Sequence, residues 1–392
     1  MSSTSAMAFG HSGSRRSLPR LDWPLLALVS LLLLLGLVMV TSASIATASQ
    51  GGGEPFAFLQ RQLVLVLAGC GLAALCFMIP IARLEQLALP MLLVATALLV
   101  LVLVPGIGAT VNGSRRWLRL PGFNFQVSEA ARMLALIYVA SYCVRFEKEL
   151  RSTLWGFARP MLGLAVLAGL LLCEPDFGAA TVLTATGFAL LFLAGAQLRW
   201  VLASVVLGGA AMALLVVTSG YRMRRFLAYL NPWADPLKDG FQLTQSLIAI
   251  GRGEWFGVGL GASVQKLFYL PEAHNDFIFA VLAEELGLVG VVVTLGLYMA
   301  LVWRVLSLAM QANRAGLRFH AYVAAGFGIW LGVQAFANIG VNMGVLPTKG
   351  FTLPLMSYGR SSLIVTLVWL GIVLRVHHEL LGSMRGSRER AA

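Results

Sequence analysis

Apolar runs of about twenty residues recur along the chain from Pro24 to Leu380. Each run is long enough to cross, as a helix, the roughly 30 Å hydrocarbon core of a bilayer. The runs are continuous and do not alternate between apolar and polar residues, which disfavours a transmembrane β-barrel. The sequence therefore predicts an all-α polytopic membrane protein.

Composition supports this class and excludes others. Of the 392 residues, 58% are hydrophobic and only 12% are charged, whereas soluble chains carry about 25% charged residues. These values exclude a soluble enzyme, a disordered tail protein and a secreted disulfide scaffold. The net charge of +12 would suggest nucleic acid as partner of a soluble chain. Here cations in loops orient the helices and contact anionic lipid, so we expect membrane lipid and no nucleic acid as partner.

The apolar runs predict about ten transmembrane helices. They lie at about 24–46, 62–80, 86–104, 128–146, 155–173, 178–196, 199–218, 277–303, 319–344 and 361–380. An even number places both termini on one side, and arginines in both tails mark that side as cytoplasmic. We therefore expect a basic cytoplasmic tail over 1–23, a membrane domain over 24–380 and a second cytoplasmic tail over 381–392. One large outer loop covers about 219–276.

The N-terminus leaves an alternative open. The segment Ser14–Leu18 resembles a twin-arginine export signal, and Ala46–Ala48 resembles a cleavage site. However, the apolar run from Pro24 to Val40 is long for a signal peptide, and further spans follow it. We therefore expect an uncleaved first span.

Three arginines lie in a short connection predicted to face outward: Arg115, Arg116 and Arg119. The positive-inside rule disfavours cations in such a connection, and only long loops escape that rule. Cations kept outside against this rule indicate an anionic ligand at the outer face.

Acidic side chains at membrane depth are costly and mark candidate functional sites. Glu129 and Arg132 lie three residues apart at the start of the fourth span, so they share a helix face. They form either a structural ion pair or the lining of a polar cavity. Asp176 follows Pro175 at the N-terminus of the sixth span, where it is either a helix cap or a cavity carboxylate.

Asp276 closes the large loop and directly precedes the apolar run Phe277–Val281. A carboxylate at this boundary is either a helix cap or a general base that accepts a proton from a substrate hydroxyl. Uncharged polar side chains also gather in the large loop and before the last span, where they suit sugar recognition or loop hydrogen bonding. They are Gln242, Gln245, Ser246, Ser357 and Tyr358.

Several stretches together resemble the SEDS family (shape, elongation, division and sporulation) of ten-span bacterial proteins. They are Val127–Glu129 with Arg132, Glu174–Gly178, Gly240–Ser246, Gly259–Lys266, Leu270–Asp276 onward through Ala283–Gly287, and Leu346–Gly350 through Ser357–Gly359. The stretches Pro347–Leu353 and Asn231–Pro236 and the basic N-terminal tail are more similar to the cell-division branch than to the elongation branch.

The resemblance implies a peptidoglycan glycosyltransferase that polymerises lipid II into β-1,4-linked glycan at the outer face of the inner membrane, at the division septum. It implies that Asp276 is the essential aspartate and that Glu129, Arg132 and Asp176 line the cavity. It also implies a class B penicillin-binding protein and other divisome proteins as partners. The chain departs from common family residues at Val127, Arg132, Phe268, Asn275 and Arg360, which replace proline, lysine, glutamate, threonine and glycine.

The implied donor is an α-linked polyprenyl diphosphate sugar and the product bond is β, so we expect a single inverting displacement with Asp276 as general base. Candidates for binding the substrate and stabilising its diphosphate are Arg115, Arg116, Lys266 and Lys349. A divalent cation, Mg²⁺ or Mn²⁺, is a further candidate, although no ligand set is legible. The alternatives are a lipid II flippase, which makes no polymer, and a scaffold that tolerates substitution of Asp276.

Overall fold

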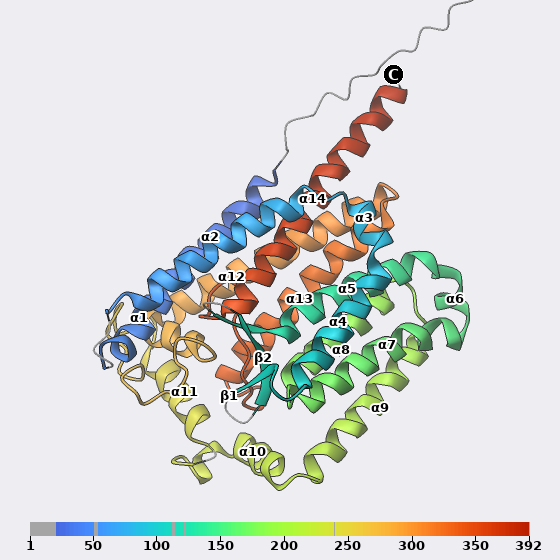
Figure 1. Ribbon diagram of the computed structural model, residues 1–392. Helices are drawn as coiled ribbons and strands as arrows, with labels where there is room; N and C mark the ends of the chain where they lie inside the picture. The colour runs from blue at the N-terminus through green and yellow to red at the C-terminus, as the bar shows by residue number, and fades with distance from the viewer. Residues whose placement is uncertain (1–20, 51–53, 112–113, 121–122, 239, 392) are drawn as a thin grey trace, which may run out of the picture.

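The computed structural model describes residues 21–50, 54–111, 114–120, 123–238 and 240–391 (Figure 1). Among these residues, seven helices are long and apolar enough to cross a membrane, and three shorter apolar helices accompany them. Together they coincide with the predicted spans, and the all-α polytopic membrane fold is confirmed. The segment Ser14–Leu18 lies outside the described residues, whereas Ala46–Ala48 lies within a continuous first helix.

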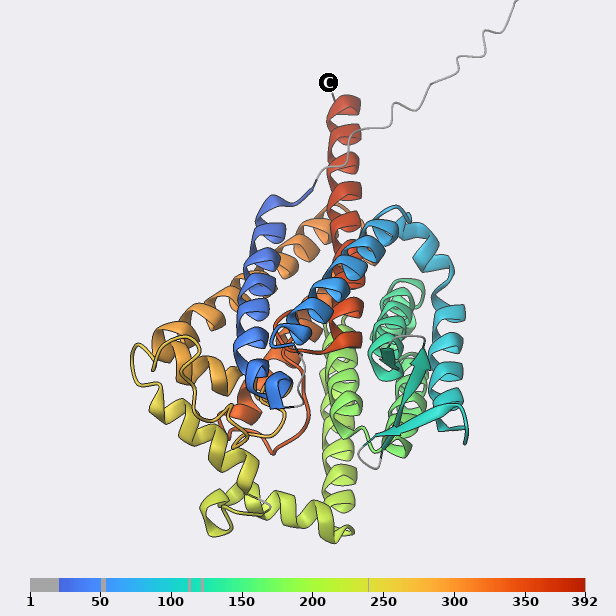
Figure 2. The same cartoon turned by 60° about the vertical axis from the view of Figure 1, so that its left-hand side comes forward.

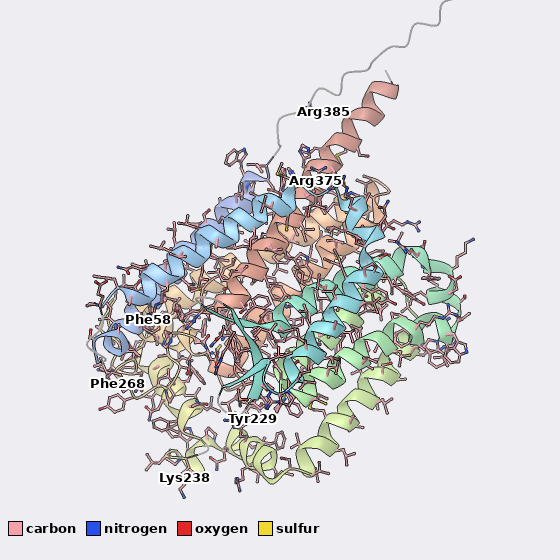
Figure 3. The ribbon with its side chains drawn as sticks, in the orientation of Figure 1. Phe58, Tyr229, Lys238, Phe268, Arg375 and Arg385 are labelled. Carbon is pink, nitrogen blue, oxygen red and sulfur yellow. The ribbon has the colours of Figure 1, made fainter. Side chains whose placement is uncertain are left out.

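The spans are α1 (Trp23–Gln50), α2 (Ala57–Phe77), α4 (Ala88–Leu103), α5 (Val127–Arg145), α7 (Leu154–Cys173), α8 (Phe177–Leu193), α9 (Leu198–Val217), α12 (Ile278–Arg314), α13 (Arg318–Asn342) and α14 (Arg360–Ala391). Between them lie α3 (Ile81–Gln86), α6 (Glu147–Ser152), α10 (Gly220–Leu230), η1 (Pro232–Ala234) and α11 (Phe241–Arg252). The start of α1 and the end of α14 lie at one end of the bundle, and α10 and α11 lie at the other (Figures 1 and 2). Figure 3 accordingly places Arg385 far from Tyr229 and Lys238.

Close helix packing encloses α5 and α13 at the centre of the bundle, where 72% and 78% of their span windows are buried. In a bilayer, helices associate through close packing of small residues because lipid tails are as apolar as the side chains. A Cβ on Gly371 of α14 would lie 2.3 Å from the carbonyl oxygen of Ala73 in α2. Similarly, a Cβ on Gly187 of α8 would lie 2.5 Å from Leu164 of α7. These glycines therefore set how closely the spans approach.

The connection between α4 and α5 folds into a three-stranded antiparallel sheet that the sequence analysis did not predict. The strands β1 (Gly108–Val111), β2 (Ser114–Leu120) and β3 (Phe123–Gln126) are paired in the order β1-β2-β3. Successive side chains of a strand point to opposite faces of its sheet. Arg115 and Arg116 are consecutive residues of β2, so their side chains lie on opposite faces of the sheet.

The large loop between α9 and α12 is joined to a break in α12. Gly287 interrupts that helix with φ 64° and ψ −163°, a backbone region that is essentially restricted to glycine. The amides of Val258 and Gly259 donate to the carbonyls of Glu284 and Glu285 at 2.9 and 3.1 Å. The loop thus pairs with the exposed backbone of the break, which fixes it to the bundle.

Candidate functional site

Polar side chains surround a cavity of about 30 Å³ at the end of the bundle that carries the sheet and the large loop. The lining residues come from β3, α5, α8, α13 and the segment before α14. They are Gln126, Glu129, Arg132, Asp176, Ala179, Gln334, Gly350, Phe351 and Thr352. The structure therefore brings together the three residues that were predicted to line a cavity, Glu129, Arg132 and Asp176.

Glu129 and Arg132 form a buried ion pair that also lines the cavity. Arg132 Nη2 lies 2.5 Å from Glu129 Oε1, and the two side chains are only 3% and 5% exposed. Arg132 Nη1 donates to Oε1 of Gln334 on α13 at 3.0 Å. The other oxygen of Glu129, Oε2, is buried and has no partner among the described residues. Both predicted interpretations of this pair therefore hold at once.

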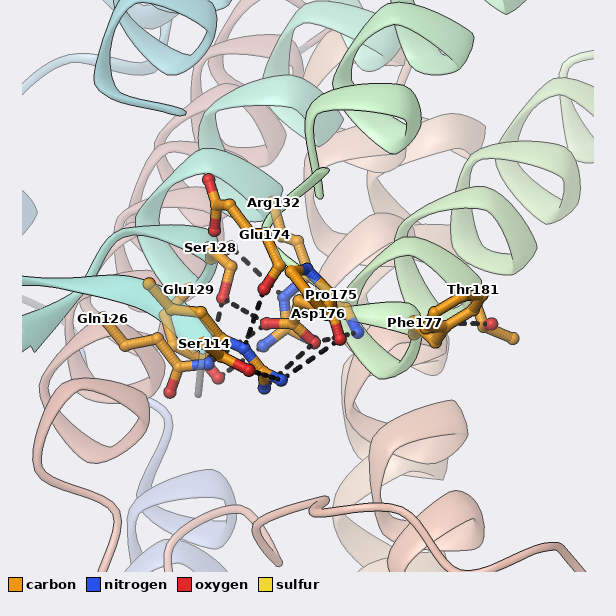
Figure 4. A network of polar contacts seen from close by, with 12 residues as sticks. Ser114, Gln126, Ser128, Glu129, Arg132, Glu174, Pro175, Asp176, Phe177 and Thr181 are labelled. Atoms are coloured by element: carbon orange, nitrogen blue, oxygen red, sulfur yellow. Dashed lines mark hydrogen bonds and ion pairs between the residues drawn. The ribbon is translucent and has the colours of Figure 1, made fainter. Parts of the chain in front are cut away.

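Asp176 also combines its two predicted roles. Its Oδ1 accepts a hydrogen bond of 3.0 Å from the amide of Ala179 and so caps α8. Its Oδ2 accepts hydrogen bonds from Ser128 Oγ at 3.2 Å and from Gln126 Nε2 at 3.3 Å. Figure 4 shows these contacts converging on the carboxylate. Asp176 therefore links the N-terminus of α8 to the start of α5.

Arg116 lies at this site, whereas Arg115 does not. Arg116 donates to the carbonyls of Glu174 and Pro175, both at 3.1 Å, and its Nη1 lies 3.9 Å from Asp176 Oδ1. Arg115 is on the opposite face of β2, where its Nη1 donates at 3.0 Å to the carbonyl of Leu103 at the end of α4. Of these two arginines, only Arg116 is placed beside the cavity residues.

Asp276 lies two residues before α12 and is half-buried. Its backbone carbonyl accepts hydrogen bonds from the side-chain amides of Asn338 and Asn342 on α13, at 2.9 and 3.0 Å. The N-terminus of α12 has Phe277 as its cap residue and no side-chain cap bond, so the predicted capping role is wrong. The Asp276 carboxylate has no hydrogen-bond partner among the described residues, which leaves its oxygens available as acceptors.

Gly350 joins this carboxylate to the cavity. It lines the cavity, and a Cβ built on it would lie 2.7 Å from Asp276 Oδ2. Burial and the negative charge of Glu272 together raise the pKa of Asp276 to about 7, although the positive charge of Arg116 acts in the opposite direction. A carboxyl group with a pKa near neutrality is well matched to general base catalysis at neutral pH.

We expect Gly350→Ala to lower the turnover of the site about tenfold or more, because the new methyl group presses on the Asp276 carboxylate and displaces it. The measurement is the rate at which the purified variant carries out the glycan formation that the family resemblance implies. Gly251→Ala is the matched control, because a Cβ on Gly251 of α11 meets nothing within 4 Å. Equal rates for both variants would contradict the close approach of Gly350 to Asp276.

The two predicted lysines differ in their surroundings. Lys349 Nζ lies 4.9 Å from the centre of the Phe177 ring, next to Asp176, which keeps its charge near the cavity. Lys266 is buried elsewhere: its Nζ lies 2.7 Å from Glu285 Oε1 and 2.8 Å from Ser42 Oγ. Glu285 already neutralises the charge of Lys266, and the structure does not bring Lys266 to the cavity lining.

None of the five uncharged candidates, Gln242, Gln245, Ser246, Ser357 and Tyr358, lines the cavity. Ser357 Oγ donates to the carbonyl of Asn275 at 2.7 Å, and the Tyr358 amide donates to the carbonyl of His274 at 3.1 Å. Ser246 Oγ donates to the carbonyl of Asn342 at 2.8 Å. These three residues therefore hold the segment around Asp276, and the helix that contacts it, in place. Gln242 and Gln245 are partly exposed on α11.

Sequence analysis missed the amides of α13. Gln334, Asn338 and Asn342 recur every four residues, so they lie along one helix face. That face contacts Arg132, the backbone of Asp276 and the amide of Ala280. The sequence did contain a signal for these residues, because three side-chain amides recur at helical spacing within an apolar run. Polar groups at membrane depth are costly and therefore indicate a functional or structural contact.

The fold and the site together define a polytopic helical membrane protein with a polar cavity beside a half-buried carboxylate. The family model of cell cycle proteins that groups FtsW, RodA and SpoVE matches residues 22–381. The chain therefore belongs to this family, the SEDS family.

Relatives with curated names and solved structures agree with this membership. The chain is 57% identical over 365 residues to a "Probable peptidoglycan glycosyltransferase FtsW" of Thioalkalivibrio sulfidiphilus, which covers 93% of this chain and 91% of the relative. A protein of the same name from Nitrosococcus halophilus is 53% identical, with coverage of 93% and 94%. These are FtsW relatives, in line with the predicted cell-division branch.

Two solved structures share the fold. One belongs to a study of "Structural coordination of polymerization and crosslinking by a peptidoglycan synthase complex". It is 36% identical to this chain with a TM-score of 0.74, and the match covers 92% of this chain and 98% of the other. The other is the rod shape determining protein RodA of Thermus thermophilus, at 34% identity, a TM-score of 0.69 and coverage of 92% and 97%.

Proposed function

We propose that this protein is a peptidoglycan glycosyltransferase that polymerises lipid II into β-1,4-linked glycan strands. The observation that carries the proposal is the half-buried Asp276 carboxylate, which has no partner among the described residues and adjoins, through Gly350, a cavity containing Arg132. The names of the FtsW relatives support it. A general base beside a cationic cavity suits the transfer of a sugar from a diphosphate leaving group.

In the proposed reaction, a hydroxyl of the acceptor sugar attacks the anomeric carbon of the donor. The new carbon–oxygen bond forms as the bond from that carbon to the diphosphate oxygen breaks, and configuration inverts. Asp276 accepts the hydroxyl proton, while the diphosphate leaves with the bonding electron pair. Arg116, whose Nη1 lies 3.9 Å from Asp176 Oδ1, and Lys349, whose Nζ lies 4.9 Å from the centre of the Phe177 ring, supply positive charge for the departing anion.

Metal participation stays a prediction. Among the described residues there is no group of three or more His, Cys, Asp or Glu side chains that could hold a metal ion. The nearby carboxylates are partly committed, because Glu129 pairs with Arg132 and Asp176 caps α8. A bound Mg²⁺ or Mn²⁺ would therefore need oxygen ligands from the diphosphate. It would then help the cationic side chains to stabilise the negative charge of that group.

We also propose a setting for this activity. The protein lies in the bacterial inner membrane with both termini cytoplasmic and the cavity end facing outward, concentrated at the division septum. The arginines near the C-terminal end of α14 support this orientation. Its proposed partners are a cognate class B penicillin-binding protein and other divisome proteins, and the structural relative from a peptidoglycan synthase complex supports the first of these.

The direct test incubates the purified protein in detergent with fluorescent lipid II, with and without the cognate penicillin-binding protein, and separates products by gel electrophoresis. Detergent removes the two compartments that a flippase needs, so polymer formation distinguishes an enzyme from a transporter. We expect a ladder of glycan strands. Failure to form polymer under both conditions, with correctly folded protein, would overturn the proposal.

The pH dependence of the polymerisation rate gives a second test of the proposed base. Only the deprotonated Asp276 accepts a proton, so we expect the rate to fall about tenfold per pH unit below about pH 7. Glu272 raises the pKa of Asp276 by charge repulsion. Glu272→Gln should therefore shift the acidic limb to lower pH while the rate at high pH stays near that of the wild type. An unchanged profile would remove Asp276 from this role.

A further inference from the structure

The helix α10 lies across the end of the bundle instead of spanning it. It begins two residues after Thr218, the residue at which α9 is capped. In both views of the molecule, α10 runs across the direction of α9 at the end opposite the C-terminus (Figures 1 and 2). Its position is therefore where α9 leaves the membrane.

The side chains of α10 are segregated around the helix. At 100° per residue, Met223, Phe226, Leu227 and Leu230 fall on one arc, and the cationic Arg224 and Arg225 fall on the rest of the surface. Large side chains of the apolar arc are exposed, with Phe226 at 40%, Leu227 at 56% and Leu230 at 63%. Such exposure is unfavourable in water, at about 25 cal/mol for each Å² of apolar surface.

The apolar surface continues on both sides of this arc. After α10, Trp233 is 58% exposed and Leu237 is 81% exposed. Before it, the outward face of α9 exposes Val206 at 70% and Val217 at 66%, as expected for a helix in contact with lipid. Exposed apolar side chains therefore occur in succession on α9, on α10 and in the turn that follows.

We propose that α10 and the turn through Leu237 bind the membrane surface, with the apolar arc inserted at the boundary between headgroups and acyl chains. The occupant of this surface is the anionic phospholipid of the leaflet that adjoins the large loop. Helices with an arginine-bearing polar face and a Trp, Phe and Leu face lie in this interface, where cations meet lipid phosphates. Tryptophan is enriched at the same depth, which matches Trp233.

This attachment also bears on the segment before α14. Tyr229 of α10 donates a hydrogen bond of 2.8 Å from its hydroxyl to the carbonyl of Val345, four residues before Lys349. A lipid-bound α10 therefore gives the segment that carries Lys349 and Gly350 a fixed height relative to the bilayer. The inference rests on the exposure of the apolar arc and on the charge of the opposite face, and it holds whether or not the protein polymerises glycan.

The test attaches an environment-sensitive fluorophore to single cysteines in full-length protein whose four native cysteines are replaced by alanine. Leu227→Cys and Leu230→Cys report on the apolar arc, Ala228→Cys on the opposite side of α10, and Val206→Cys on the lipid-facing surface of α9. The proteins are reconstituted in vesicles of phosphatidylglycerol and phosphatidylethanolamine. Quenching is measured with a lipid that carries a nitroxide near its headgroup and with aqueous iodide.

We expect lipid quenching at 227 and 230 to exceed that at 228 at least threefold, and to approach that at 206 of α9. Iodide should show the reverse order. Equal iodide quenching at all three positions of α10 would overturn the proposal, because the helix would then lie in water. Protection of 227 and 230 from both quenchers would also overturn it, since protein would cover the arc. Circular dichroism and gel filtration establish that each variant is folded.

Discussion

Asp276→Asn is expected to abolish polymerisation of lipid II, with a loss of about 10²–10⁴-fold, the contribution typical of a general base. The exchange keeps the shape of the side chain and leaves the backbone carbonyl that Asn338 and Asn342 bind. It removes only the ability of the carboxylate to accept a proton. The measurement is the initial rate of glycan formation from fluorescent lipid II by purified protein.

Asp235→Asn serves as the matched control, since it makes the same chemical change after η1 in the same large loop. This control should keep nearly the full rate, and both variants should have the thermal stability of the wild type. A scaffold would tolerate either exchange, and a flippase would make no polymer in either case. Polymerisation by Asp276→Asn at the wild-type rate would therefore assign the proton transfer to another group.

The spans were predictable because each is a local property of the sequence. An apolar run long enough to cross the bilayer has few alternatives to a helix, since every backbone polar group must be satisfied within it. The break at Gly287 was not predictable in this way. The sequence around it was predicted as one span, and the break depends on backbone hydrogen bonds from Val258 and Gly259 of a distant loop.

The small sheet was missed for a related reason. Its strands contain four to seven residues, and the arginines of β2 were recognised only as exceptions to the orientation rule, which does not indicate a strand. The face that each arginine occupies follows from strand alternation. Because Arg115 and Arg116 are neighbours in β2, they lie on opposite faces of the sheet. Arg116 therefore lies beside Asp176, whereas Arg115 contacts Leu103.

The candidate site was predictable in its parts and not in its assembly. Spacing along one helix gave the Glu129–Arg132 pair, and position before a helix gave the cap by Asp176. The proximity of Asp276 to the cavity depends on Gly350, which lies 74 residues further along the chain. Hydropathy and local spacing carry no information about such contacts. The partner of Lys266 was hidden for the same reason.

Removing the carboxylate of Glu285 is expected to cause the largest loss of stability. Glu285 is fully buried at the start of α12, and its Oε1 lies 2.7 Å from Nζ of Lys266, which is 7% exposed. Ser42 of α1 donates to the same carboxylate at 2.7 Å. Glu285→Ala would leave a buried ammonium without a counter-charge, which costs about 3–5 kcal/mol. The expected result is a strongly lowered melting temperature of the purified protein in detergent.

A double variant separates the charge from the packing at this site. Glu285→Leu combined with Lys266→Met removes both charges and keeps similar volumes, and replacing a buried pair in this way is often neutral or stabilising. We therefore expect the double variant to recover most of the stability that Glu285→Ala loses, with Glu285→Gln in between, since it keeps an acceptor for Ser42. If the double variant melts as early as Glu285→Ala, the hydrogen bond from Ser42 to Glu285, and not the ion pair, is the contact that stabilises this site.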